Sequence, residues 1–103
     1  MALRIETDPR LLKTRFSRWL EERMDERDMP QLTLAGKSGV SQGHISGILR
    51  AGKFPEDDKV KRLARALQAD AEEGLAAVYL DRIERVLEGA PASTRALFKK
   101  LLQ

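Results

Sequence analysis

Apolar residues recur at intervals of three and four residues along most of the chain. This spacing places them on one face of an α-helix. The first run predicts a helix over residues 9–28 that begins at Asp8 and Pro9 and buries Trp19 in the core. No segment alternates apolar and polar residues with a period of two, so we expect no β-sheet. The sequence therefore predicts an all-α protein.

Prolines, glycines and capping residues divide the remainder into five further helices. Pro30 interrupts the first apolar pattern, and Gly39 supplies the positive φ that ends the next helix. Ser41 is the expected N-cap of the helix after that turn, and Asp70 is the cap of a later one. The expected helices cover residues 31–37 and 42–50, a segment through 60–67, a segment through 75–87, and a short last helix through 97–102.

The distribution of charge is more informative than its total. The chain has 19 Lys and Arg residues against 16 Asp and Glu residues, a net charge of only +3. Between Asp28 and Glu56, however, there is no acidic residue. A locally acid-free segment is an electrostatic footprint for a polyanion, although a chance gap is the alternative. The titratable residues in this window are Lys37, His44, Arg50 and Lys53.

Composition excludes several classes of site. The chain has no cysteine and one histidine, which excludes disulfides, thiolate metal sites and a zinc site built on cysteine and histidine. The N-terminus lacks the apolar segment of a signal peptide, and no apolar run is long enough to span a bilayer. We expect a cytoplasmic, nucleoid-associated protein that is not an enzyme, binds no cofactor or metal, and does not enter a membrane.

Gly43 and Gly47 stand four residues apart inside the predicted helix 42–50, where each costs roughly 1 kcal/mol relative to alanine. At 100° per residue, one arc of this helix is polar and small, and the opposite arc is apolar. An α-helix fits the DNA major groove, where glutamine and arginine can bond base edges. The alternative is that the glycines are merely tolerated in a loop-like segment. The polar arc comprises Gln42, Gly43, Ser46, Gly47 and Arg50, and the apolar arc comprises Ile45, Ile48 and Leu49.

Residues 31–49, "QLTLAGKSGVSQGHISGIL", resemble the helix-turn-helix of the lambda-repressor and Cro-like (Xre-type) family. Ala35 matches the small residue at the helix crossing, and Gly39 matches the turn glycine. Val40, Ile45 and Ile48 match the apolar positions that lock the second helix onto the first.

The resemblance extends over about residues 16–75. It implies a five-helix lambda-repressor-like domain over residues 1–75, followed by a short helical extension over 76–103.

The resemblance also implies which residues contact DNA. Glutamines at the positions of Gln31 and Gln42 bond each other in several family members, and one of them reads adenine. Three positions depart from the family pattern: Pro30 replaces a Ser or Thr cap, Ser38 replaces an apolar residue, and Gly52 follows one residue late. The predicted DNA-binding residues are Gln31, Ser41, Gln42, Gly43, Ser46 and Gly47, together with His44, Arg50 and Lys53 near the phosphates.

The segment from residue 75 to 103 carries more apolar residues than a five-helix domain needs. It could fold back on its own core, but we expect it to form a homodimer interface. The sequence therefore predicts a dimeric repressor of phage or bacterial type that binds a palindromic operator in double-stranded DNA. The alternative is an antitoxin-like protein, whose tail binds a partner toxin and whose helix-turn-helix autoregulates.

Overall fold

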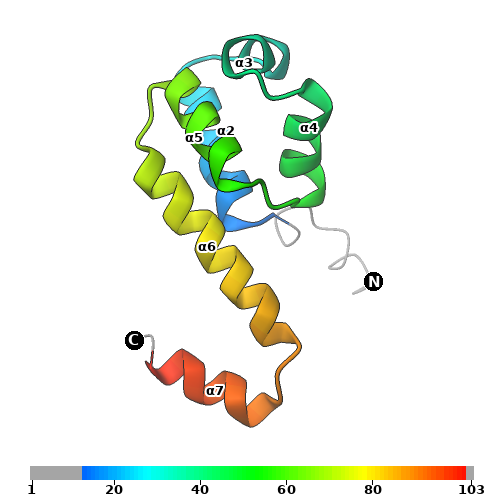
Figure 1. Cartoon of the computed structure of the whole chain (residues 1–103), viewed down its shortest axis with the longest axis vertical. Coiled ribbons are helices and arrows are strands. Elements are labelled where there is room, and N and C mark those ends of the chain that lie inside the picture. The colour runs from blue at the N-terminus through cyan, green and yellow to red at the C-terminus, as the bar shows by residue number, and fades with distance from the viewer. Residues whose placement is uncertain (1–12, 102–103) are drawn as a thin grey trace, which may run out of the picture.

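The computed structural model describes residues 13–101, and within this range the chain is all-helical (Figure 1). The predicted fold class is confirmed, and the two helices predicted over residues 31–37 and 42–50 begin where expected and end one residue later. The helices are α2 (Arg15–Glu26), α3 (Gln31–Ser38), α4 (Gln42–Ala51), α5 (Asp57–Leu67), α6 (Ala71–Glu88) and α7 (Ala92–Leu101).

The first of these helices is shorter than the predicted helix 9–28. Lys13 and Thr14 are not helical, and Asp8 and Pro9 lie outside the described residues. The prediction was wrong for Lys13 and Thr14 because Thr14 is the N-cap: its side chain accepts a hydrogen bond from the backbone N–H of Ser17. The helix also ends two residues before the expected residue 28.

A side chain distant in sequence also defines the start of α2. The carboxylate of Asp81, in α6, accepts hydrogen bonds from the backbone N–H groups of Arg15 and Phe16, each at 3.0 Å. The first N–H groups of a helix have no partner within it, so Asp81 satisfies two donors that would otherwise be buried without one. This contact fixes the start of α2 to the middle of α6.

The turn between α3 and α4 forms as predicted. Gly39 has φ of +77°, and the side chain of Ser41 accepts a hydrogen bond of 3.1 Å from the N–H of His44. Ser38 is buried in the place of an apolar residue, but its Oγ accepts a hydrogen bond from the N–H of Val40. Pro30 provides no side-chain cap for α3. The helix-turn-helix therefore tolerates both departures from the family pattern, Pro30 before α3 and Ser38 at its end.

The core lies between α2, α3, α4, α5 and the first half of α6. The apolar positions expected to lock the helix-turn-helix are buried, and Trp19 also belongs to the core, as predicted. The largest side chains of the core are Phe16, Trp19, Leu20, Leu34, Val40, Ile45, Ile48, Val60, Leu63, Leu67 and Val78.

The two halves of α6 have different surroundings. Asp70 caps the helix as predicted, and Gly74, Val78 and Asp81 are buried where α6 packs on α2 and α5. The second half extends beyond the other helices and ends at α7, which has no buried residue (Figure 1). The domain boundary expected between residues 75 and 76 thus falls inside one continuous helix.

Candidate nucleic-acid interface

The two arcs predicted for α4 differ in burial as expected at most positions, with Ser46, Gly47 and Leu49 half-buried. Ile45 and Ile48 are completely buried against the core, whereas Gln42, Gly43 and Arg50 are exposed. Each buried isoleucine stabilises the fold by roughly 1.5–3 kcal/mol, which fixes the rotation of the helix about its axis. The polar arc is therefore held outward by the packing of the opposite side.

The predicted contact residues of this arc have their polar groups available. The side chains of Gln42, Ser46 and Arg50 make no hydrogen bond with other described residues. Gln31, at the start of α3, is half-buried, and its side chain makes no hydrogen bond with Gln42 in the structure. His44 is also half-buried, at the edge of the arc.

The two glycines of α4 differ in what surrounds them. A Cβ atom built on Gly43 would have no neighbour within 4 Å, so this part of the surface is open. A Cβ built on Gly47 would lie 3.2 Å from Cδ of Lys53, because the aliphatic part of that lysine crosses the glycine. The absence of a side chain at Gly47 thus makes room for Lys53, a role that the sequence pattern alone did not indicate.

Lys53 reaches this position because α4 ends with a left-handed residue. Gly52 has φ of +65°, and the N–H of Lys53 bonds to the carbonyl oxygen of Gly47 at 3.4 Å. A glycine takes positive φ without the steric cost of a Cβ, so the late position of Gly52 still ends the helix. The ammonium group of Lys53 is carried at the same end of α4 as Arg50.

A helix-turn-helix family model matches residues 20–73, which is just over half of the 103 residues. The chain belongs to the helix-turn-helix family of the lambda-repressor-like, Xre type. Members of this family are DNA-binding regulators, so this domain is a DNA-binding one. Neither the curated proteins nor the solved structures gave a match to the chain.

In this helix-turn-helix domain the acid-free window, residues 29–55, folds into α3, α4 and the segment after α4. Within residues 13–101, most acidic residues lie on α2, α5 and α6, where many of them pair with Lys or Arg side chains. Carboxylates that are already neutralised, and that lie on other elements, repel a polyanion less than carboxylates within the contact surface would. The charge pattern and the exposed arc of α4 therefore coincide on the same elements.

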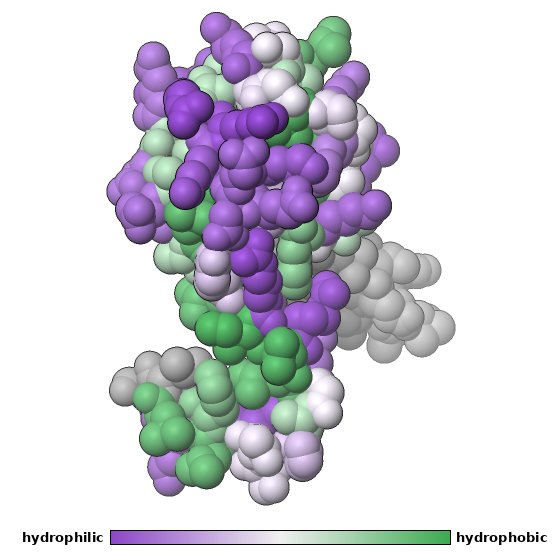
Figure 2. Space-filling model, viewed as in Figure 1, coloured by the Kyte–Doolittle hydropathy of each residue, from purple (hydrophilic) through white to green (hydrophobic). Residues whose placement is uncertain are grey.

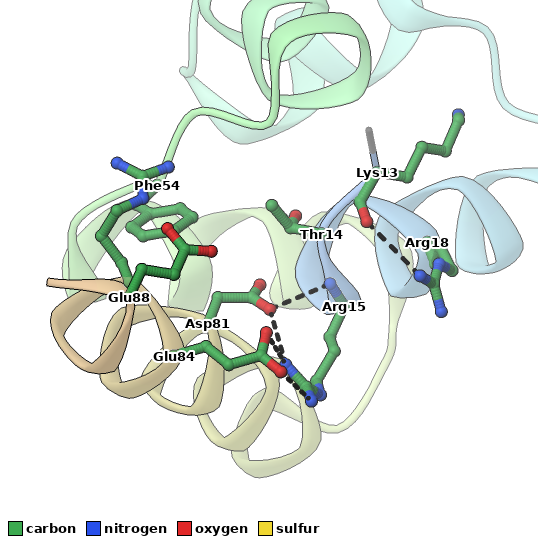
Figure 3. Close-up of a pocket in the computed structure, with 9 residues that line it drawn as sticks. Lys13, Thr14, Arg15, Arg18, Phe54, Asp81, Glu84 and Glu88 are labelled. Carbon is green, nitrogen blue, oxygen red and sulfur yellow. Dashed lines mark hydrogen bonds and ion pairs between the residues drawn. The ribbon is translucent and has the colours of Figure 1, made fainter. Parts of the chain in front are cut away.

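A hollow lies elsewhere on the surface, where the start of α2 meets α6 (Figure 3). It has a volume of about 400 Å³ and is lined mainly by charged residues, among which Arg15 pairs with Asp81 and with Glu84. Arg15 donates hydrogen bonds of 2.8 and 2.9 Å to Glu84, and this lowers the pKa of the Glu84 carboxyl group. Arg15 also pairs with Asp81, so the residues that line this hollow hold α2 and α6 together.

Two other kinds of site are not found within residues 13–101. No helix in this range combines the length and apolarity that crossing a bilayer requires. The same residues contain no group of His, Asp or Glu side chains arranged to hold a metal ion. Glu56, Asp57 and Asp58, which are adjacent in sequence, instead cap and begin α5.

Proposed function

We propose that this protein is a cytoplasmic transcriptional repressor that binds a palindromic operator as a homodimer. α4 acts as the recognition helix and enters the major groove, where Gln42, Ser46 and Arg50 contact base edges or phosphates. Ser41 caps α4 and His44 lies in its first turn, while Gln31 begins α3. Gly43 keeps the surface of α4 low, so that the backbone there can lie close to the bases, and Gly47 makes room for the side chain of Lys53.

The observation that carries the proposal is the outer arc of α4. It contains no acidic residue, and it is exposed at Gln42, Gly43 and Arg50 and half-buried at Ser46 and Gly47. The polar side chains of Gln42, Ser46 and Arg50 have no partner among the described residues. In a DNA-binding family such an arc on the second helix of the motif is suited to reading bases. Because Gly43 and Gly47 remove two side chains from the arc, part of the specificity would come from DNA shape.

The dimer would form through the second half of α6 and through α7. Hydrophobic residues gather over this part of the molecule, below the mostly polar surface of the helix-turn-helix domain (Figures 1 and 2). A groove of about 280 Å³ with an almost wholly apolar lining runs between the two helices. The exposed apolar side chains here are Tyr79, Leu80, Ile83, Val86, Leu97 and Leu101, of which Val86 is 75% and Leu101 76% exposed.

We infer that a second copy of the chain covers this surface, because one domain of this size offers few base contacts. Two-fold pairing doubles them and requires half-sites about one helical turn apart, roughly 34 Å between centres. The test is selection of bound sequences from a random duplex pool, together with sedimentation of the protein with and without DNA. Palindromic selected sequences and a dimer support the proposal, whereas a monomer bound to a single asymmetric site would refute the dimeric part.

The same exposed apolar groove favours a second candidate function. An antitoxin-like protein would cover the groove with a partner toxin and use the helix-turn-helix to control its own expression. Co-expression with the product of the neighbouring gene and copurification of a stable complex would support this candidate. A homodimer that buries the groove and leaves no protein partner bound would favour the repressor.

A further inference from the structure

The segment that follows the recognition helix, residues 52–56, has no regular secondary structure but is firmly held. Gly52 and Pro55 are buried, Phe54 is half-buried, and Lys53 between them is exposed. The contacts that hold the segment decide where the ammonium group of Lys53 lies. One is the backbone hydrogen bond from Lys53 to Gly47, and two others come from α6, a helix that is distant in sequence.

Arg82 of α6 makes the most direct of these contacts. Its Nη2 donates a hydrogen bond of 2.8 Å to the carbonyl oxygen of Pro55, and its Nη1 lies 3.1 Å from Oδ1 of Asp57. The hydroxyl group of Tyr79, one turn earlier, donates a hydrogen bond of 2.6 Å to Oδ2 of the same carboxylate. One guanidinium group thus joins α6 to the segment after α4 and to the first turn of α5.

Two further observations support this arrangement. The guanidinium group of Arg85 lies 4.5 Å from the centre of the Phe54 ring, so the same face of α6 contacts a second position of the segment. The hydrogen bond from Tyr79, together with Arg82, holds the pKa of the Asp57 carboxyl group below its ordinary value of 3.8. Asp57 is therefore ionised at neutral pH and remains a partner for Arg82.

We propose that Arg82 is a positioning residue for DNA binding, and that it acts by holding Lys53 where its ammonium group meets a phosphate. The proposal rests on the proposed function, because it needs Lys53 to contact DNA. Pro55 follows Lys53 by two residues, so fixing its carbonyl group restricts the backbone that carries the lysine. A segment that is ordered before binding loses less conformational entropy when the complex forms.

Arg82 and Tyr79 both lie outside residues 20–73, the part of the chain that the family model matches. The family motif provides the recognition helix and Lys53, and α6 provides the side chains that hold the segment after that helix. α6 would therefore contribute to DNA affinity without touching DNA itself.

The test is a double-mutant cycle on the full chain, with a fluorescent duplex of random sequence as the probe. Lys53→Ala removes one phosphate contact, which lowers affinity roughly fivefold at 0.15 M salt and reduces the salt slope by about 0.9. Arg82→Gln should produce a loss of up to the same size and a similar change in slope. If the two residues act together, the double variant should bind no more weakly than Lys53→Ala alone.

Arg65→Gln provides the matched control. It removes the same charge from an exposed position on α5, where the arginine side chain has no hydrogen bond or ion pair with the described residues. Its effect should be small and should add to that of Lys53→Ala. Tyr79→Phe, which removes only the hydroxyl group on Asp57, replaces Arg82→Gln in the cycle if the latter variant fails to fold.

The possible failures can be told apart. Loss of affinity by the same factor in the wild-type and Lys53→Ala backgrounds would overturn the positioning role, as would unchanged affinity for Arg82→Gln. Unchanged affinity for Lys53→Ala would also overturn it, while leaving DNA binding by α4 intact. A wild-type chain that binds no duplex at any salt concentration would instead refute the proposed function.

Discussion

The same substitution, glycine to alanine, should have opposite effects on stability at two helical positions. Gly43 lies in the first turn of α4, and a Cβ there would meet nothing within 4 Å. Alanine restricts the unfolded chain more than glycine does and causes no clash at this position. We therefore expect Gly43→Ala to raise the free energy of unfolding by about 0.5–1 kcal/mol.

At Gly74 in α6 the space for a methyl group is already filled. A Cβ there would lie 3.1 Å from Cη2 of Trp19 and 3.1 Å from Cγ1 of Val60. The tryptophan ring cannot easily retreat, because it stacks on Phe16 and its Nε1 donates a hydrogen bond to Glu73. Overpacking of this kind costs about 1–3 kcal/mol, against a gain of about 1 kcal/mol in helix propensity. We expect a net loss of up to about 2 kcal/mol.

The assay is urea unfolding at 25 °C, followed by circular dichroism, of both variants and of Gly36→Ala. Gly36 lies in α3 with open space around it, so its alanine variant should be stabilised like Gly43→Ala. A Gly74→Ala protein that is stabilised like Gly43→Ala would contradict the close packing of α6 on α2. A destabilised Gly43→Ala protein would contradict the open surface assigned to α4.

The two stabilising substitutions, Gly43→Ala and Gly36→Ala, should differ in their effect on DNA binding. If Gly43 faces the major groove, a methyl group there should weaken binding to the selected operator, whereas Gly36→Ala should leave it unchanged. Gly47→Ala is less informative, because it would also displace Lys53. A more stable Gly43→Ala protein with unchanged operator affinity would refute the groove-facing assignment of this arc.

Three further predictions concern other parts of the molecule. Gln42→Ala should weaken operator binding by about 1–3 kcal/mol and leave random DNA unaffected, and equal losses on both duplexes in a titration would contradict base reading. Val86→Glu should shift the dimer toward monomer in sedimentation, and an unchanged dimer would place the interface elsewhere. The depressed pKa of Glu84 means that its pairing with Arg15 stabilises the fold above pH 4.5, its ordinary pKa, and that this contribution is lost as the pH falls through the lower pKa of the folded state. The melting temperature of Arg15→Gln should therefore lie below that of the wild type at pH 6 and approach it in acid, and a difference independent of pH would contradict this assignment.

The helix-turn-helix could be predicted because local signals specify it. Gly39 at the turn, Ser41 at the cap, and Ile45 and Ile48 on one face are all set by spacings of a few residues. Each acts through steric or hydrogen-bonding effects that do not depend on the rest of the fold. The outward direction of Gln42 follows from the burial of the two isoleucines.

Contacts between distant segments could not be predicted in this way. The start of α2 depends on Asp81, which reaches it from more than sixty residues away, and a pattern of neighbouring residues contains no trace of that contact. The packing of Trp19 on Gly74 is equally remote, although a glycine inside an otherwise regular helical pattern was a usable signal. The sequence also placed Gly47 on the arc correctly but could not show that Lys53 crosses it.

α6 has a buried face and an exposed face, and the contacts of the buried face indicate that the DNA-binding domain extends beyond residue 75. One face carries Val78 and Asp81 into the core and fixes the start of α2, so a chain cut near residue 71 would lose buried apolar area and leave two helix donors without partners. The other face carries Ile83 and Val86 outward beside α7. A variant that disrupts dimerisation but keeps the DNA-binding domain folded must therefore be changed on the outer face of α6. Suitable changes are a substitution there or removal of the residues after 88. If a chain cut near residue 71 loses its affinity for DNA, the cause would be unfolding rather than the loss of a dimer.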